Sequence, residues 1–509
     1  MTPKRANSRA LAVRTATPKR TNGPGPAAHD DTHLNRRLYE RLRTQILTGN
    51  LRPGEKLPST RALADNLRVS RNTVLKAFDQ LTAEGYLRVR GGSGSYVARE
   101  LPDDFTQSSA GRRFQKIAET RDELGIHVRS STSTDRAALA LAPARANRPF
   151  QPGIPALDAF PYAAWTKILT RHWKRRPAEL LGYAGSVGFP ALREAIYSYL
   201  TLSRGVQCEP EQVIVVSGVQ QALNLVSRVL LKPGDSVLIE EPGYFGAQSV
   251  FDASYAKMIP VEVDSNGLNV SAAIAANTRA RLVYTTPGNQ FPTGSSMSIA
   301  RRHELLRWAA KTGAWIVEDD YDGEFRYSSR PLPALQGLDR VGSVIHVGSF
   351  SKLLFPAMRL GYMVVPAALL ERMSIAKFAL DYHTPTIDQA VVAEFMTAGH
   401  FLRHVRRMRA LYLDRLEILL KSMHSELNGA VTVARPDAGM HVVASFSPGV
   451  DDTAIATAAR NMGVSSLPLS LCYLGRKRAS GLILGYAAYS SDQIKQGCRQ
   501  LATVLNQLQ

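Results

Sequence analysis

Apolar positions change their spacing along the chain, and these changes divide it into segments of different structure. Between residues 33 and 98 they recur every three or four positions, which is the spacing of helices that bury one face. Three short helices are expected there: Gly49-Asn50 ends the first, while Ser59 and Ser70 cap the second and third. The stretch 68–70 between the last two helices is short, as a helix-turn-helix requires.

Two runs of alternating residues, 86–90 and 95–97, flank a glycine-rich stretch that ends at Gly94. Alternation around glycines predicts a β-hairpin, and a hairpin beside a helix-turn-helix is a wing. A recognition helix enters the major groove of DNA by its N-terminal turn. We therefore expect four side chains of the third helix to project outward as candidate DNA contacts: Arg71, Asn72, Thr73 and Lys76.

The charge of this first segment favours the same interpretation. Residues 33–98 contain twelve Lys or Arg against five Asp or Glu, in a chain whose net charge is +20. Such an excess neutralises phosphates, so double-stranded DNA is the predicted partner and binding should weaken as salt rises. A solvated basic face on a small helical domain is the alternative, but capping, spacing, wing and charge agree on DNA binding.

Beyond residue 150 the apolar residues form short unbroken runs separated by helical patterns. Strands that are buried on both faces give such runs, so we expect a mostly parallel sheet covered by helices, an α/β fold. A long helix over 401–423, short strands and a last helix from Ser491 form a smaller C-terminal part. The expected strands of the larger part are 213–216, 237–240, 258–263, 282–285, 315–317, 344–347 and 362–365.

One lysine, Lys352, lies in small or apolar company after the run 344–347. Lost hydration favours its neutral amine, which is the form that makes a Schiff base with an aldehyde. Arg359 follows a proline and offers a fixed fork suited to a phosphate. A lone lysine is more often an ordinary surface residue. Pyridoxal phosphate is favoured here because Asp319, just past an apolar strand, supplies the carboxylate that keeps a pyridine nitrogen protonated.

The first segment resembles the GntR type of winged helix. Two stretches account for the resemblance: residues 58–64, Pro-Ser-Thr-Arg-Ala-Leu-Ala, and residues 70–74, Ser-Arg-Asn-Thr-Val. The resemblance implies that Arg61, Arg71, Thr73 and the wing glycine Gly94 contact DNA.

The remainder resembles the fold-type I aminotransferases. Glu-Asp-Asp-Tyr at 318–321 followed by Ser-Phe-Ser-Lys at 349–352 is most similar to their MocR-type relatives, in which a GntR winged helix is fused to an aminotransferase-like domain. The resemblance implies that Lys352 holds the cofactor covalently, that Asp319 meets the pyridine nitrogen and that Tyr321 meets the ring hydroxyl. It also implies phosphate contacts by Ser349, Arg359, Gly218, Val219 and Gln220, stacking of Tyr244 on the ring, and a hydrogen bond from Asn289 to the ring hydroxyl.

Two positions depart from the family's pattern. Gly288-Asn289 stands where MocR-type proteins more often have Ser-His. Aminotransferases place an arginine for the substrate carboxylate before Leu-Gly-Phe-Ala, but Leu484-Gly485-Tyr486-Ala487 has no arginine in that register. Arg476 or Arg478 could substitute. The sequence leaves that choice open, and also whether the effector is an α-amino acid.

Composition and the resemblance together give the expected multidomain organisation. Residues 1–32 form a basic tail that is too polar to bury a core, and we expect it to be disordered. A GntR-type domain at 33–98 and a linker at 99–150 precede the aminotransferase-like domain at 151–509, whose large part ends at about 380. The resemblance implies a head-to-tail homodimer, with the winged helix of one chain against the large domain of the other.

The resemblance implies a transcriptional regulator that senses an amine or amino acid, or the cofactor itself, through the internal aldimine with Lys352. The alternative is an active aminotransferase with an appended DNA-binding domain. A scaffold without cofactor is disfavoured, because dimerisation alone would not require lysine, aspartate, tyrosine and arginine at separate strand ends.

The remaining composition narrows the function classes. Cys208, Cys472 and Cys498 are too few and too scattered for a disulfide framework or a metal site. No apolar run approaches the about 18 residues that span a membrane, and the N-terminus lacks the apolar core of a secretory signal. We therefore expect a cytoplasmic protein without a metal.

Overall fold

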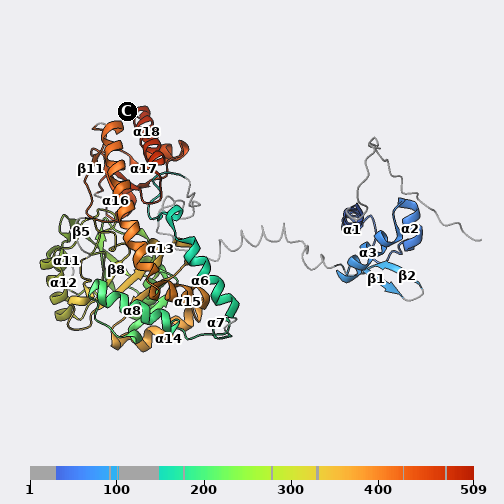
Figure 1. Ribbon diagram of the computed structural model, residues 1–509, viewed down its shortest axis with the longest axis horizontal. Helices are drawn as coiled ribbons and strands as arrows, with labels where there is room; N and C mark the ends of the chain where they lie inside the picture. The colour runs from blue at the N-terminus through green and yellow to red at the C-terminus, as the bar shows by residue number, and fades with distance from the viewer. Residues whose placement is uncertain are drawn as a thin grey trace, which may run out of the picture. The chain divides into compact units, whose positions relative to one another are not determined.

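The computed structural model describes residues 30–90, 93–99, 101, 148–175, 178–276, 279–327, 332–427, 429–475 and 478–508. These residues belong to two compact units, Met1–Val128 and Arg129–Gln509, each with its own core (Figure 1). Most of the expected tail and linker lie outside the described residues.

The first unit contains the predicted three helices and hairpin. Helix α1 (Asp30–Leu47) begins three residues before the expected domain boundary. It is followed by α2 (Thr60–Leu67), α3 (Arg71–Ala83) and the antiparallel strands β1 (Leu87–Arg90) and β2 (Gly94–Val97). Apolar side chains from all of these elements meet in one core: Leu38, Leu42, Ile46, Ala64, Val74, Phe78, Leu81, Leu87 and Val97.

Both predicted serine caps are present. Ser59 Oγ accepts a hydrogen bond from the Ala62 N–H at 3.2 Å, and Ser70 Oγ accepts one from the Thr73 N–H at 3.1 Å. Between them Arg68 adopts a left-handed φ of 53° and closes the end of α2. The short turn that follows leaves the first turn of α3 exposed at Arg71 and Asn72.

An eight-stranded sheet forms the centre of the second unit, in the order β3-β10-β9-β8-β7-β4-β5-β6. Strands β5, β4, β7, β8 and β9 pair in parallel, whereas β10 is antiparallel to both β9 and β3. The prediction of a mostly parallel sheet is confirmed. The strands are β3 (Val213–Val216), β4 (Ser236–Glu241), β5 (Lys257–Asp264), β6 (Gly267–Leu268), β7 (Leu282–Thr285), β8 (Trp315–Asp320), β9 (Val344–Ser349) and β10 (Gly361–Val364).

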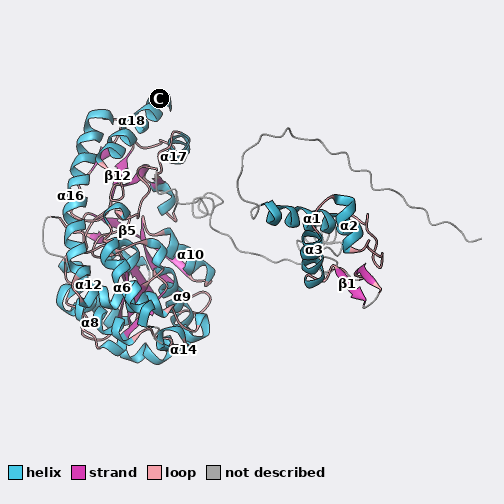
Figure 2. Cartoon of the chain, turned by 45° about the vertical axis from the view of Figure 1, so that its right-hand side comes forward, coloured by secondary structure: helices cyan, strands magenta, loops and turns pink. Residues whose placement is uncertain are grey.

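Helices cover both faces of this sheet (Figure 2). Alternate residues of β4 show why both faces are apolar: Val237 and Ile239 pack in one core, and Leu238 packs in another on the opposite face. The helices of this body are α6 (Tyr162–Arg175), α7 (Ala178–Leu181), α8 (Pro190–Arg204), α9 (Val219–Leu230), α10 (Phe245–Ala253), α11 (Val270–Ala276), α12 (Ile299–Thr312), α13 (Phe350–Leu353), α14 (Leu370–Asp381) and α15 (Thr386–Thr397).

A long helix, α16 (His400–Leu427), runs from the sheet body into the smaller C-terminal part (Figure 1). That part contains α17 (Asp452–Asn461), α18 (Ser491–Leu508) and an antiparallel sheet in the order β11-β12-β14-β13. Its strands are β11 (Thr432–Val433), β12 (His441–Ser445), β13 (Leu467–Pro468) and β14 (Gly481–Gly485).

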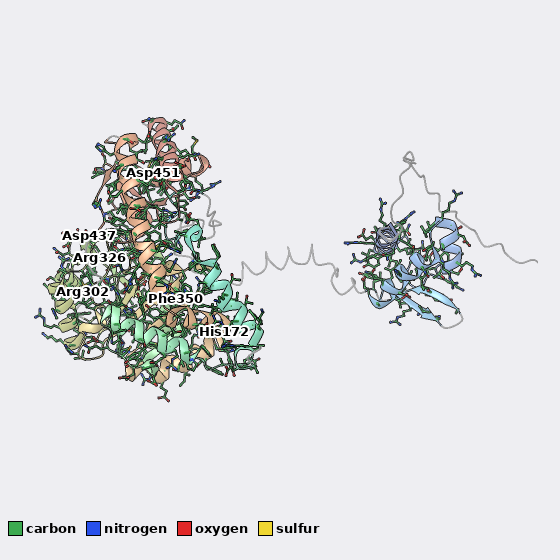
Figure 3. The ribbon with its side chains drawn as sticks, viewed as in Figure 1. His172, Arg302, Arg326, Phe350, Asp437 and Asp451 are labelled. Atoms are coloured by element: carbon green, nitrogen blue, oxygen red, sulfur yellow. The ribbon has the colours of Figure 1, made fainter. Side chains whose placement is uncertain are left out.

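The smaller part is joined to the sheet body by contacts that include the following two. The Gly485 N–H of β14 donates to the Phe150 carbonyl at 2.9 Å, which fixes the segment before α6 against the small sheet. Arg326, after β8, lies 3.6 Å from the Asp437 carboxylate before β12, and Figure 3 labels both residues. Elements that are far apart in the sequence therefore meet at the carboxyl ends of the central strands.

Candidate functional site

A cavity of about 650 Å³ lies at the carboxyl ends of the central strands. Parallel strands bring these ends to one edge of a sheet, where α/β proteins bind their ligands. Its lining includes one residue from each of five strand ends: Val219 after β3, Tyr244 after β4, Thr286 after β7, Tyr321 after β8 and Lys352 after β9. The sheet thus brings together residues that the sequence could place only at separate strand ends.

Lys352 lies in the short helix α13, which is anchored by the fully buried Phe350 (Figure 3). Its Nζ donates a hydrogen bond to the Gly153 carbonyl at 2.8 Å. A Cβ atom on Gly153 would lie 2.6 Å from this Nζ, so only glycine leaves room for the lysine. Burial lowers the pKa of Lys352 below its ordinary value, against the opposing charges of Asp322 and Asp319. The site therefore favours the neutral, nucleophilic amine.

Asp319 is the penultimate residue of strand β8, and its Oδ2 accepts a hydrogen bond from the Tyr284 hydroxyl at 2.6 Å. Burial raises the pKa of this carboxyl to about 7. Its other oxygen, Oδ1, is buried and has no partner among the described residues. Asp319 lines the cavity, so a protonated ring nitrogen would satisfy an acceptor that the chain leaves open.

The start of α9 has the geometry that the predicted anion site requires. Gly218, with φ of 117°, caps the helix, and Val219 and Gln220 are its first residues with free backbone N–H groups. The Arg359 guanidinium lies against this turn, because a Cβ on Gly218 would be 3.6 Å from Arg359 Nη2. Ser349 lines the same cavity. A helix start, a guanidinium and a hydroxyl together fit a phosphate group.

Tyr244 and Phe245 both line the cavity, and the sequence favoured Tyr244 as the ring that stacks on the cofactor. The Tyr244 hydroxyl accepts a hydrogen bond from Gln220 Nε2 at 3.1 Å. Its ring also meets Phe291 edge to face, with centroids 5.9 Å apart. These two contacts hold the Tyr244 ring between the phosphate turn and the rest of the cavity.

Asn289 lies next to the cavity rather than in its lining. Its Nδ2 donates to the Tyr321 hydroxyl at 3.2 Å and to Asp322 Oδ1 at 2.8 Å, so it holds two residues that do line the cavity. Sequence reasoning missed Asp322, although it directly follows Tyr321 in a run of acids. Burial raises the pKa of Asp322 well above its ordinary value.

The first unit presents a basic surface around the start of α3. Arg61, Arg71, Asn72 and Lys76 are exposed, as predicted, and so is Gly94 in the wing, where φ is 110°. Tyr96 in the wing lies beneath two cations, with Arg90 at 5.2 Å and Lys56 at 5.9 Å from its ring centroid. Helix start and wing thus carry positive charge and hydrogen-bond donors suited to DNA.

The prediction that Thr73 projects outward is wrong. Its side chain is only 3% exposed, and its hydroxyl forms a 2.7 Å hydrogen bond with Ser70 Oγ. The reason is the cap itself: Ser70 draws the third residue of α3 inward, beside the buried Val74. Thr73 stabilises the first turn of the recognition helix from within.

Comparison with known proteins agrees with both units. Residues 160–501 match the family "aminotransferase class I and II", and residues 34–97 match the bacterial regulatory proteins of the gntR family. The probable rhizopine catabolism regulatory protein MocR of Rhizobium meliloti is 39% identical over 92% of this chain and 93% of its own length. The chain belongs to the MocR-type transcriptional regulators.

Two further relatives bear on the cofactor of this MocR-type regulator. The pyridoxine biosynthesis transcriptional regulator PdxR of Corynebacterium glutamicum is 29% identical, over 92% of this chain and 95% of its own length. The kynurenine aminotransferase structure of Pyrococcus horikoshii superposes with a TM-score of 0.68 at 29% identity, covering 73% of this chain and 94% of that one. Fold and family imply pyridoxal phosphate. The open Asp319 Oδ1, the cradle at Gly218 and the lowered pKa of Lys352 fit it.

The MocR-type regulator departs from aminotransferases in its small sheet. Ile483, the residue before Leu484-Gly485-Tyr486-Ala487, is fully buried in an apolar cluster with Phe291 and Leu467. Of the two arginines considered as substitutes, Arg476 lies outside the described residues. Arg478 is exposed, donates to the Gly475 carbonyl at 3.1 Å and does not line the cavity. Two other arginines line it, Arg148 and Arg460, and sequence reasoning missed both.

None of the helices in the described part of the regulator is long and apolar enough to cross a membrane. No group of three or more His, Cys, Asp or Glu side chains in the described ranges is placed to hold a metal ion.

Proposed function

We propose that this regulator senses a primary amine or amino acid in its large unit and conveys the signal to operator DNA bound by its winged helix. The proposal rests on Lys352, whose shielded amine has a lowered pKa and lines a cavity with Asp319 and Tyr321. A DNA-binding unit on the same chain gives such a site a regulatory use.

When bound, pyridoxal phosphate supplies an aldehyde that bonds reversibly to amines and a ring that withdraws electrons. The chain's own residues prepare the site for that chemistry. The Gly153 carbonyl holds Lys352 Nζ in place, and burial lowers the pKa of the amine below its ordinary value. Asp319 offers its open oxygen to a ring nitrogen, and Asp322, whose pKa is raised by burial, lines the same cavity as the lysine.

An effector changes DNA binding only if it binds one of two arrangements of the regulator more tightly than the other. We propose that these arrangements belong to a head-to-tail homodimer, in which the winged helix of one chain lies against the large unit of the other. Exposed aromatic rings support a protein contact on the large unit: Tyr183 is 87% exposed and lies 5.1 Å from Tyr382, which also contacts Phe378.

Titration with amines tests the proposal. We expect an effector amine to change both the visible absorption of the holoprotein and the protein's affinity for an operator fragment. The two titration curves should have the same midpoint amine concentration, because both changes depend on occupancy of one cavity. Absorption spectroscopy and fluorescence anisotropy on the same samples measure the two responses. Spectral changes without any change in DNA affinity, for every amine in a broad panel, would refute the regulatory role.

Arg71→Ala tests the DNA-reading surface. We expect it to weaken binding to an operator selected from genomic fragments by about 1 to 3 kcal/mol if Arg71 contacts a base. The matched control is Arg36→Ala, since Arg36 is exposed on α1 and pairs with Glu40. Equal affinities for the two variants, measured by anisotropy at fixed salt, would count against the placement of α3 in the major groove.

A working aminotransferase remains the second candidate, and the intact set of Lys352, Asp319 and Tyr321 favours it. Against it stands Ile483, since an apolar residue cannot position a substrate carboxylate. Sustained formation of a keto acid from a panel of amino acids, well beyond one turnover per subunit, would favour the enzyme. A single turnover would agree with sensing.

A further inference from the structure

Part of the cavity is lined by residues that have no role toward the cofactor. Arg148 comes from the segment before Phe150, Arg460 from the end of α17, and Ser465 and Ser466 from the approach to β13. Arg148 Nη1 donates to the Arg460 carbonyl at 3.0 Å, which ties the two segments together. Two arginines from distant parts of the chain therefore line one end of the cavity wall side by side.

Neither guanidinium has a carboxylate partner among the described residues. In the described part of the chain, no carboxylate forms an ion pair with Arg148 or Arg460 within 4.0 Å. Two adjacent cations repel each other unless an anion lies between or beside them. The arginine fork suits carboxylates, sulfonates and phosphates, whose oxygens accept paired hydrogen bonds.

A buried hydroxyl gives an independent indication of a ligand. Ser466 is 7% exposed, lines the cavity, and its Oγ has no hydrogen-bond partner among the residues described. Buried polar groups are nearly always satisfied, so a hydroxyl left open toward a cavity indicates an oxygen or nitrogen of a bound molecule. Ser466 thus adds a neutral donor beside the two cations.

Ile483 stands where aminotransferases have the arginine that binds the substrate carboxylate, so a carboxylate is not bound at that position in this chain. Ile483 packs with Phe291 and Leu467, and the latter two line the cavity themselves. We propose that Arg148, Arg460 and Ser466 form the effector-selecting subsite and that the effector is an amine carrying an oxyanion held there. This inference rests on the proposed sensing function, since the amine of the same molecule would be recognised at Lys352.

The subsite also suggests how occupancy reaches the DNA-binding unit. Arg148 is the first described residue of the large unit after the winged helix. An oxyanion bound by Arg148 and Arg460 would clamp the entry of the chain onto α17. Effector binding would thereby hold in place the residue at which the described part of the large unit begins.

The test uses the full-length holoprotein and three probes of equal chain length: 5-aminopentanoate, 5-amino-1-pentanol and glutarate. Arg460→Gln should preserve the fold, because the bond from Arg148 uses the backbone carbonyl of Arg460. We expect it to raise the apparent Kd of 5-aminopentanoate, measured from the visible absorption, roughly tenfold to hundredfold. The Kd of the amino alcohol should stay within about twofold.

Two further variants sharpen the result. Arg478→Gln is the matched control, because Arg478 also donates to a backbone carbonyl of the small part but does not line the cavity. It should leave all three affinities unchanged. Arg148→Lys keeps the charge and a donor group but loses the planar fork, so it should weaken 5-aminopentanoate less than Arg460→Gln does. An equal loss for acid and alcohol, or no loss for either, would overturn the subsite.

Glutarate has carboxylates but no amine, so it tests the subsite independently of amine sensing. If no amine altered the spectrum of the wild-type protein, amine sensing would fail. Calorimetric binding of glutarate to the wild type but not to Arg460→Gln would still support the subsite. Equal glutarate binding by wild type and variant would overturn the subsite and leave the amine chemistry untouched.

Discussion

Replacing Lys352 with alanine is expected to abolish the visible absorption of the holoprotein and its covalent link to pyridoxal phosphate. The physical reason is that the amine of Lys352, whose pKa is lowered by burial, lies in the same cavity as the start of α9 and Asp319. Absorption spectroscopy gives the first readout. Borohydride reduction followed by peptide mapping gives the second, and it should find a pyridoxyl group on Lys352 of the wild type and on no lysine of the variant.

Lys377 offers a matched control. Among the lysines in the described part of the large unit it is the fully buried one, and burial lowers its pKa as well, but it pairs with Asp381 and does not line the cavity. Lys377→Met should therefore retain the absorption and the labelled peptide at Lys352. An unchanged spectrum in Lys352→Ala, or a label elsewhere in a folded, cofactor-supplied sample, would refute the assignment.

The sequence predicted the central sheet well, because its strands are buried on both faces and their apolar runs are local features. The stretch 213–216 corresponds to β3, and 282–285 corresponds to β7. The serine caps of α2 and α3 were predictable for the same reason, since a cap and its helix are neighbours in the chain. Such features depend on a few adjacent residues.

The missed features depend on contacts between distant segments. Arg148 enters the cavity because Phe150 pairs with Gly485 in β14, and no local pattern reports a pairing across most of the chain. Arg460 faces the cavity only because α17 packs beside that segment. Asp322 was adjacent to a predicted residue, but its role depends on Asn289 from another strand end. The candidate residues around Lys352 could be predicted from single motifs, whereas the end of the cavity lined by Arg148 and Arg460 could not.

The buried pair of Arg204 and Asp320 provides the comparison for a last prediction at the neighbouring Asp319. Both aspartates end β8, but Asp320 bonds the buried Arg204, whereas Asp319 has a tyrosine hydroxyl and an open oxygen. Asp320→Asn breaks a buried ion pair and should destabilise the protein by about 3 to 5 kcal/mol with or without cofactor. Asp319→Asn should behave differently in the two forms.

Without cofactor, Asp319→Asn is expected to stabilise the large unit at pH 8. The pKa of Asp319 in the folded protein is raised to about 7, well above its ordinary value of 3.8. The buried charge of Asp319 therefore lowers the free energy of unfolding fully above about pH 7, and has no effect on it below about pH 4. The difference in unfolding free energy between variant and wild type should approach about 4 kcal/mol at pH 8 and shrink towards zero as the pH falls to about 4. The same substitution should weaken cofactor binding. Without the carboxylate, no group holds a protonated ring nitrogen, so the binding free energy of pyridoxal phosphate should become less favourable by about 1.5 to 3 kcal/mol. Urea unfolding of the cofactor-free forms across this pH range, together with cofactor titration at pH 8, measures both effects. A destabilised cofactor-free variant, or an unchanged cofactor affinity, would show that Asp319 has a structural role like that of Asp320.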